Sequence, residues 1–263
     1  PVTIHPATFG LPEPGIEDRR HLWPGGAYLG SASTWPHTQG GMSEYLIVDK
    51  SMLRVLPEGV SLKAASLAEP LAVGLHAIRL AGGVEGKRVL VSGSGPIGLL
   101  LAAAAVAKGA LEVTCTDVLE GPLERARKVG AARTIRVGAE EIPAMAFDLA
   151  FECSGAPAAV TAAIAAVRRA GTLVQVGVLA NEARPVNLAP FVSKELTMIG
   201  SFRFDDEIEE AIELIASDPR FTEVITHDFP ASAVEAAFAT ALDSDVSGKV
   251  VVSLWLDDGS ERP

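Results

Sequence analysis

The sequence Gly-Ser-Gly-Pro-Ile-Gly that starts at residue 93 has the residue types and spacing of a phosphate cradle. An apolar run predicts a strand before it, and a second apolar run predicts a helix after it. Gly93 allows a tight turn, Gly95 lets the backbone approach a pyrophosphate, and Gly98 lets the helix pack on the strand. Pro96 and Ile97 open the predicted helix, whose N-terminus favours phosphate groups. These residues are therefore predicted to bind a dinucleotide.

An acidic residue, Asp117, follows the cradle at the distance expected for ribose recognition. It ends the next predicted strand, where a carboxylate can accept hydrogen bonds from both ribose hydroxyls. The residues from Val118 to Glu120 include no Arg or Lys that could bind a 2′-phosphate, so we predict NAD rather than NADP. Two alternatives are a glycine-rich turn without a ligand and a methyltransferase-type sheet, whose glycine loop normally has a different spacing.

A single carboxylate, Glu69, interrupts the apolar stretch 66–76. Burying an unpaired carboxylate is costly, so such a group usually has a partner such as a base, backbone donors or a metal ion. Glu69 could instead cap a helix N-terminus, with Pro70 at the first helical position, which is a common helix start. The stretch alone favours the cap over a ligand, and both interpretations stay open at this point.

Apolar strands separated by helices dominate the middle of the chain. Strands that are apolar throughout are typical of a parallel sheet covered by helices on both faces. The sequence therefore predicts an α/β fold with a doubly wound parallel sheet, and helices at 70–81, after residue 95, at 121–129 and near 157–168. The predicted strands are 88–92, 112–116, 134–137, 148–153, 171–177 and 196–200.

The segments on either side of this sheet have a different character. Residues 1–40 are rich in Pro, Gly and Thr and predict loops and short strands, and a further strand is predicted at 45–48. After residue 203 we predict two helices and a final strand, at 206–216, 231–242 and 249–255. Each flanking segment is small for a core of its own, so we expect them to form one second domain.

The composition excludes several classes of partner. The chain has 263 residues and a formal net charge of −11, which disfavours nucleic acid and anionic membranes, because phosphate binding needs clustered Lys and Arg. Cys115 and Cys153 lie in apolar runs and fit a reducing cytosol. The apolar run 89–107 is broken by Gly and Pro, so we predict a strand, turn and helix rather than a membrane span. We expect a soluble cytoplasmic protein without a signal peptide.

Seven stretches keep the order and approximate spacing of one enzyme family, at 28–32, 36–41, 68–73, 86–89, 93–98, 151–155 and 200–204. With them the chain resembles the medium-chain, zinc-type dehydrogenases, and among these the polyol (sorbitol) dehydrogenase group. The resemblance implies part of a GroES-like, mostly β catalytic domain over 1–70, an NAD-binding Rossmann domain over 71–203, and a return to the catalytic domain over 204–263. It also implies a small-molecule substrate and a homodimer or homotetramer.

The resemblance implies an active site built around a catalytic zinc ion. Glu69 would be the late acidic member of the zinc shell, either as a ligand or bound to the zinc water. Arg203 would donate a hydrogen bond to a hydroxyl or carboxylate of the substrate. The other implied contacts are Val176 and Gly177 beside the nicotinamide, Ser201, Phe202 and Arg203 at the nicotinamide riboside and the substrate, and Ser33, Trp35 and His37 in the substrate loop.

Two departures from the family pattern concern zinc. The family's earlier catalytic ligands, a Cys and a Gly-His-Glu motif, occur nowhere in this sequence, so we expect an inactive fragment or a truncated relative. Phe9, Pro12, Gly15 and Trp23 stand where the family's structural zinc lobe has four cysteines. These side chains offer no thiolate, imidazole or carboxylate, so structural zinc is expected to be absent. The other histidines form no pair at metal-ligand spacing and are given no role, and His76 is expected to pack locally on its helix.

The resemblance thus implies an NAD-dependent, zinc-dependent oxidoreductase that oxidises a secondary alcohol of a polyol or sugar acid. Zinc would lower the pKa of the bound alcohol, and nicotinamide would accept the hydride. One alternative is a zinc-free medium-chain reductase, although such NADPH enzymes usually lack counterparts of Glu69-Pro70 and Asp117. The other is a non-catalytic dinucleotide-binding protein, which the missing zinc ligands make plausible.

Overall fold

A computed structural model describes residues 1–33 and 35–254 and contains one large parallel sheet. The strand order is β10-β9-β8-β5-β6-β7, and all neighbouring pairs are parallel. The predicted doubly wound α/β fold is therefore confirmed. The strand order reverses between β5 and β8, which is where ligands bind in such sheets. The strands are β5 (Arg88–Ser92), β6 (Glu112–Asp117), β7 (Arg133–Arg136), β8 (Phe147–Glu152), β9 (Val167–Gln175) and β10 (Thr197–Gly200).

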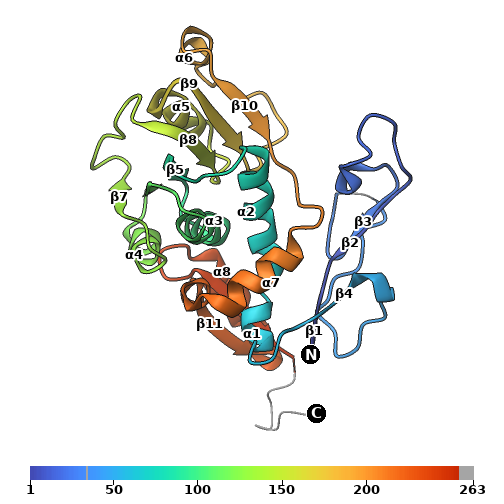
Figure 1. Cartoon of the computed structure of the whole chain (residues 1–263). Coiled ribbons are helices and arrows are strands. Elements are labelled where there is room, and N and C mark those ends of the chain that lie inside the picture. The colour runs from blue at the N-terminus through green and yellow to red at the C-terminus, as the bar shows by residue number, and fades with distance from the viewer. Residues whose placement is uncertain (34, 255–263) are drawn as a thin grey trace.

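Helices cover both faces of this sheet (Figure 1). Successive strand residues point to opposite faces, so Val89 and Val91 of β5 join one apolar cluster and Leu90 joins the other. The first cluster includes side chains of α2 (Ala68–Leu80), α3 (Pro96–Ala107) and α4 (Glu120–Lys128). The second includes side chains of α5 (Pro157–Ala166) and α6 (Ala189–Ser193). The apolar cores therefore fix the sheet from both sides and leave its carboxyl edge for the site.

The N-terminal segment contains two small antiparallel sheets beside this body (Figure 1). β1 (Val2–Ile4) pairs with β4 (Leu53–Val55), and β2 (Ala7–Thr8) pairs with β3 (Ala27–Tyr28). The short helices η1 (Arg20–Leu22), η2 (Lys50–Met52) and α1 (Leu62–Ala65) connect these strands with each other and with α2.

The strand predicted at 45–48 is wrong, because these residues have no regular secondary structure. Tyr45 and Ile47 are 82% and 100% exposed. A strand needs a neighbour to satisfy its backbone, and the described part of the chain places none beside this stretch. Apolar and β-branched residues alone therefore gave a misleading signal here.

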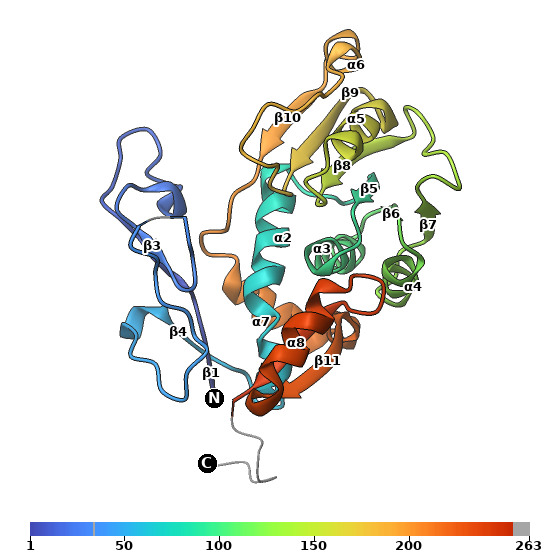
Figure 2. The ribbon, with the colours of Figure 1, turned by 180° about the vertical axis from the view of Figure 1, so that it is seen from behind.

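The C-terminal segment packs against the helices of the sheet (Figure 2). Its parallel pair β11–β12 lies beside α8, and α7 packs on α2. No strand joins this segment to the N-terminal sheets within the described residues, and the two segments meet through side chains. The domain boundaries at 70 and 203 remain a prediction. The bounds are α7 (Ile208–Ser217), η3 (Pro219–Val224), β11 (Ile225–Pro230), η4 (Ala231–Ala233), α8 (Val234–Leu242) and β12 (Lys249–Ser253).

Two further observations bear on the sequence predictions. The final strand ends at Ser253, and the predicted end at Trp255 lies outside the described residues. Across the described ranges, none of the helices has both the length and the apolar character that a membrane crossing requires. The apolar run 89–107 is divided between β5 and α3, as predicted.

Candidate active site

The glycine-rich turn between β5 and α3 has the geometry expected of a phosphate cradle. Gly93 has φ +94°, in the region that favours glycine, and Gly95 precedes the helix that Pro96 and Ile97 begin. A Cβ atom on Gly98 would lie 1.9 Å from the carbonyl oxygen of Gly93, so only glycine fits there. A Cβ atom on Gly95 would meet nothing within 4 Å. The turn is therefore closed where the helix packs and open where a pyrophosphate would approach, which fits a dinucleotide.

Asp117 is joined directly to this cradle. It is the last residue of β6, and its Oδ2 accepts a hydrogen bond from the Ser94 backbone N–H at 2.9 Å. Its Oδ1 accepts a second bond from Leu119 N–H at 3.1 Å. A carboxylate has about four acceptor positions, so two remain for ribose hydroxyls. The arrangement fits the predicted adenosine subsite.

Glu69 lies in the first turn of α2, and its carboxylate has a specific partner. Tyr28 on β3 donates its phenolic O–H to Glu69 Oε1 at 2.5 Å. The interpretation of Glu69 as an N-cap is wrong, because the helix begins at Ala68, its cap is Leu67, and no side chain caps it. Leu67 already has helical dihedral angles, which moves the helix start two residues ahead of Pro70.

Arg203 completes a cluster with these two residues. Its Cζ lies 4.3 Å from the Tyr28 ring centroid and 4.7 Å from that of Phe202. Its Nη2 donates to Ser31 Oγ at 3.1 Å and to Ser33 Oγ at 3.2 Å. No carboxylate pairs with it among the residues that the structure describes. Residues from three distant parts of the chain therefore present a carboxylate, a phenol, a guanidinium and hydroxyls together.

The electrostatics of this cluster show most clearly at Tyr28. Burial raises the pKa of the phenol far above its ordinary value, and the charge of Glu69 and the hydrogen bond to it raise it further. Arg203 acts in the opposite direction, because a cation favours the phenolate. Tyr28 is therefore held as a neutral hydrogen-bond donor to Glu69.

Asp205 fixes the segment after Arg203 to the N-terminal segment of the chain. The Asp205 carboxylate accepts bonds from the Arg20 backbone N–H at 3.0 Å and from Arg20 Nε at 2.9 Å. His5 Nε2 donates to the Asp205 carbonyl oxygen at 2.7 Å, and its Nδ1 accepts from Ala7 N–H at 3.2 Å. Both ring nitrogens of a neutral His5 are thus satisfied, and burial lowers its pKa.

Glu207 fixes the same segment to α2. Its Oε1 lies 2.8 Å from His76 Nδ1 and 2.6 Å from Arg79 Nε, and its carboxylate is buried. Burial opposes ionisation, but the hydrogen bonds from His76 and from the Asp205 backbone outweigh it and lower the pKa of Glu207 to about 2. This contribution to stability is complete above the ordinary Glu value and is lost as the pH falls towards 2. His76 is buried in α2 and contacts Arg79 on the same helix, as expected, but no pattern in the sequence indicated its second partner, Glu207, which is 131 residues away.

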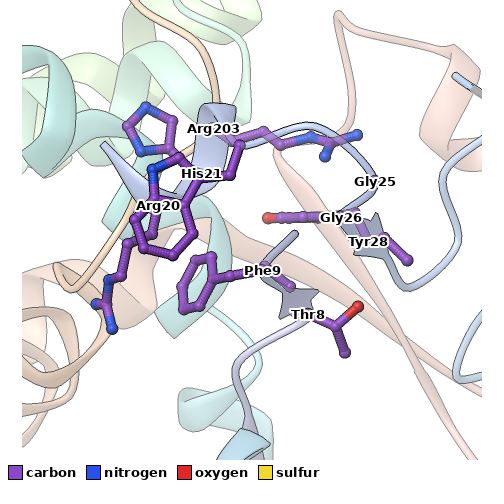
Figure 3. Close-up of a pocket in the computed structure, with 11 residues that line it drawn as sticks. Thr8, Phe9, Arg20, His21, Gly25, Gly26, Tyr28 and Arg203 are labelled. Atoms are coloured by element: carbon purple, nitrogen blue, oxygen red, sulfur yellow. The ribbon is translucent and has the colours of Figure 1, made fainter. Parts of the chain in front are cut away.

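A cavity of about 80 Å³ lies beside Tyr28 and Arg203 (Figure 3). It is bordered by Thr8, Phe9 and Arg20 of the N-terminal segment. In Figure 3 the guanidinium groups of Arg20 and Arg203 point away from each other, on either side of Phe9. The cavity therefore separates Arg20, which is paired with Asp205, from Arg203, which is not paired with a carboxylate.

The residues that replace the family's structural zinc ligands make ring and backbone contacts. The Arg20 guanidinium lies 4.4 Å from the Phe9 ring centroid, and the His5 and Phe9 rings are 5.5 Å apart. Trp23 Nε1 donates to the Ile16 carbonyl oxygen at 3.0 Å. Across residues 1–33 and 35–254, no three His, Cys, Asp or Glu side chains form a group that could hold a metal ion. Phe9 and Trp23 therefore make packing and backbone contacts at positions where the resemblance puts cysteine ligands.

The remaining predicted residues lie at the carboxyl edge or on the substrate loop. Val176 and Gly177 follow β9, and a Cβ atom on Gly177 would lie 2.3 Å from Gly155 N, so this crossing requires glycine. Ser201 Oγ is buried and has no hydrogen-bond partner in the described part of the chain. Trp35 and His37 have ring centroids 5.1 Å apart, and within the described residues no hydrogen bond or cation–π contact joins either of them to Glu69 or Arg203. Of the three predicted substrate-loop residues, the structure thus bonds only Ser33 to Arg203, whereas Trp35 and His37 pair with each other.

The comparisons with known proteins agree with this architecture. Residues 96–217 match the family described as zinc-binding dehydrogenase. L-idonate 5-dehydrogenase (NAD(P)(+)) of Escherichia coli strain K12 is 32% identical over 231 residues, which cover 85% of this chain and 66% of that protein. Sorbitol dehydrogenase of Macaca fascicularis is 32% identical over 244 residues, which cover 87% of this chain and 68% of that protein. The chain belongs to the zinc-binding dehydrogenase family.

A solved structure of the family supports the assignment. The crystal structure of L-idonate 5-dehydrogenase from Escherichia coli K-12 superposes with a TM-score of 0.90 at 31% identity, covering 96% of this chain and 75% of the other. The family members named above are longer, and this chain spans 66% of the first of them, just under two thirds. Family membership therefore does not by itself give the activity of this chain.

Sequence reasoning did not single out Glu152, a buried residue of this zinc-binding dehydrogenase. It ends β8 and is 0% exposed, and its carboxylate accepts bonds from Ser154 N–H at 2.8 Å, Gly155 N–H at 3.0 Å and Gln175 Nε2 at 2.5 Å. Those bonds fix the loops that follow β8 and β9 at the carboxyl edge. An acid at the end of an apolar strand was the available signal, as it was for Asp117.

Two glycine substitutions should separate cofactor binding from folding. Gly95→Ala should keep the thermal stability of the chain, because its methyl group meets no protein atom, yet weaken NAD binding by about tenfold. Gly98→Ala should lower the free energy of unfolding by about 1–3 kcal/mol, because the added methyl overlaps the Gly93 carbonyl. Calorimetric titration and chemical denaturation measure the two effects. Unchanged NAD affinity in Gly95→Ala would contradict the cradle.

The titration of Tyr28 tests the contact with Glu69. In a Tyr45→Phe background Tyr28 is the only tyrosine of the chain, so tyrosinate absorbance reports on it alone. We expect it to stay protonated in the folded protein at pH values where a solvated phenol, with a pKa of about 10, ionises. Glu69→Gln should lower the Tyr28 pKa, and Arg203→Gln should raise it. Ionisation of folded Tyr28 near pH 10 would show that the contact is absent.

Proposed function

We propose that this chain is the dinucleotide-binding and substrate-facing part of an NAD-dependent oxidoreductase that acts on a secondary alcohol of a polyol or sugar acid. The observation that carries the proposal is the open cradle at Gly95, whose turn is bonded directly to Asp117. When bound, NAD supplies a nicotinamide that accepts a hydride. The residues after β9 and β10, from Val176 to Gly177 and from Ser201 to Arg203, lie at the same sheet edge and are proposed to contact the nicotinamide riboside.

The substrate class is supported by the chemistry around Arg203. Its guanidinium lacks a carboxylate partner in the described chain and lies beside the hydroxyls of Ser31 and Ser33. Such a group can donate to the vicinal hydroxyls of a polyol or bidentately to a carboxylate. The names of the relatives, L-idonate and sorbitol dehydrogenase, describe substrates of both kinds. Trp35 and His37, which are exposed, are proposed to border the same substrate.

The side chains that could act as zinc ligands limit the role that we propose for zinc in this chain. The family is described as zinc-binding, and Glu69 is the residue here that the resemblance assigns to the metal shell. Catalytic zinc takes three protein ligands and keeps one open position, which the described residues do not supply together. We therefore propose that this chain binds NAD but does not oxidise polyols by itself. A non-catalytic dinucleotide-binding protein remains the second candidate for the same reason.

We further propose a cytoplasmic homo-oligomer. The edge strand β10 has no neighbour on its outer side among the described residues, and its Met198 is 40% exposed. An open strand edge can pair with a second copy of the chain. Size-exclusion chromatography with light scattering measures the association state.

The choice between NAD and NADP tests the proposed cofactor. The Asp117 carboxylate accepts from ribose hydroxyls and repels a 2′-phosphate, so wild type should bind NAD more tightly than NADP. Asp117→Ala should narrow this preference, because it removes both an acceptor and a negative charge. Isothermal titration calorimetry gives both affinities, and equal or tighter NADP binding by wild type would overturn the proposal. Asp49→Ala, which removes an exposed acid of the N-terminal segment whose carboxylate accepts from Ser51 N–H, is the matched control for charge.

Metal content and turnover test the limited role of zinc. After dialysis against zinc and then metal-free buffer, the chain should retain no stoichiometric zinc by elemental analysis, and it should bind NAD without oxidising L-idonate or sorbitol. Glu69→Gln should leave NAD affinity unchanged within about twofold, because the cradle is intact. Turnover that persists in the presence of a chelator would instead favour a zinc-free reductase.

A further inference from the structure

We propose that Arg136 is a second determinant of cofactor choice, which attracts a 2′-phosphate at the adenosine end of the dinucleotide site. The inference rests on the proposed function, because it concerns the same site. It adds a cation to a subsite in which the sequence indicates only the acidic Asp117. The consequence is a chain that prefers NAD but retains measurable affinity for the 2′-phosphorylated cofactor.

The sheet register places Arg136 directly beside Asp117. The two are Cα partners in the parallel pair of β6 and β7, and each is the last residue of its strand. Val137 N–H donates to the Asp117 carbonyl oxygen at 2.8 Å, which fixes the two strand ends to each other. Opposed residues of neighbouring strands point to the same face, with the strands about 4.8 Å apart. Arg136 and Asp117 therefore share one face at the carboxyl edge.

That shared face is the one on which the cradle lies. Asp117 Oδ2 accepts from the Ser94 N–H, so the Asp117 side chain is directed to the turn that precedes α3. On the same face of β7, Thr134 Oγ1 accepts a bond from Arg127 of α4. The helices α3 and α4 thus cover the face that Arg136 occupies, and a ribose held by Asp117 would lie next to it.

Arg136 is also free to bind an anion. It is exposed, and its guanidinium has no ion-pair or hydrogen-bond partner in residues 1–33 and 35–254. The nearby cation Arg127 is already paired with Glu120. A guanidinium binds phosphate oxygens bidentately and is always charged. The chain has a net charge of −11, and Asp117 repels a 2′-phosphate. An unpaired arginine beside Asp117 attracts that phosphate and so offsets part of the repulsion.

Two adenosine fragments isolate this attraction. 5′-AMP and adenosine 2′,5′-bisphosphate differ only in the 2′-phosphate, so the ratio of their affinities reports on the group that faces that position. The affinities are measured by calorimetric titration of the full chain, together with that for NAD. Arg133→Gln is the matched control for Arg136→Gln, because Arg133 is an exposed arginine at the opposite end of β7, about 10 Å away.

Arg136→Gln should weaken binding of the bisphosphate by about fivefold, the scale of one exposed ion pair, and change 5′-AMP affinity by less than about twofold. Arg133→Gln should leave both affinities unchanged. An unchanged ratio in Arg136→Gln, or an equal loss in Arg133→Gln, would overturn the proposal while NAD binding still supported the proposed function. Wild type that binds neither NAD nor 5′-AMP would overturn both.

Discussion

The candidate site depends on how the segment 203–207 is held. Asp205 binds Arg20 and His5 of the N-terminal segment, and Glu207 binds His76 and Arg79 of α2. The two carboxylates are nearly buried, and removing a partner from a buried carboxylate would leave it unsatisfied, so these anchors resist displacement. They hold Arg203 at φ +54°, a backbone conformation that residues with side chains rarely adopt. The position of Arg203 over Tyr28 is therefore a consequence of contacts that lie two and four residues later.

The contacts of Glu207 with α2 also link Arg203 to the helix that carries Glu69. Glu69 and His76 lie on the same face of α2, two turns apart, so the helix that carries Glu69 also holds Glu207. Tyr28 then joins β3 to that helix through its bond to Glu69. The parallel sheet contributes the other half of the site, since the bonds of Asp117 and Glu152 fix the loops at its carboxyl edge. The carboxylates of these networks are satisfied, whereas Gln175 Oε1 and His21 Nδ1 beside them are buried without a hydrogen-bond partner among the described residues.

The sequence predicts well the features that residues close together in the chain determine. The cradle could be read from three glycines and an acid because strand, turn and helix are contiguous, and the helices and strands of the sheet follow from apolar runs. Glu69 was harder: its neighbours indicated a cap, whereas its partner Tyr28 lies 41 residues earlier. His76 and Glu207 are 131 residues apart, and the register that sets Arg136 beside Asp117 exists only once β6 and β7 pair. Contacts between segments that are distant in the sequence produce no local residue pattern from which they could be predicted.

The charges of the chain suggest how an anionic ligand would be oriented. With 33 acidic and 22 basic residues, the surface as a whole repels anions. Arg136 and Arg203 depart from that background, since both lack a carboxylate partner in the described chain and lie at separate ends of one sheet edge, beside β7 and after β10. Between them, the cradle offers backbone N–H groups and a helix N-terminus to a pyrophosphate. An extended ligand with a ribose at its adenosine end, phosphates in its middle and substrate hydroxyls or a carboxylate beside its nicotinamide would match this order. The reverse orientation would place the nicotinamide, rather than the adenosine ribose, beside Asp117 and Arg136.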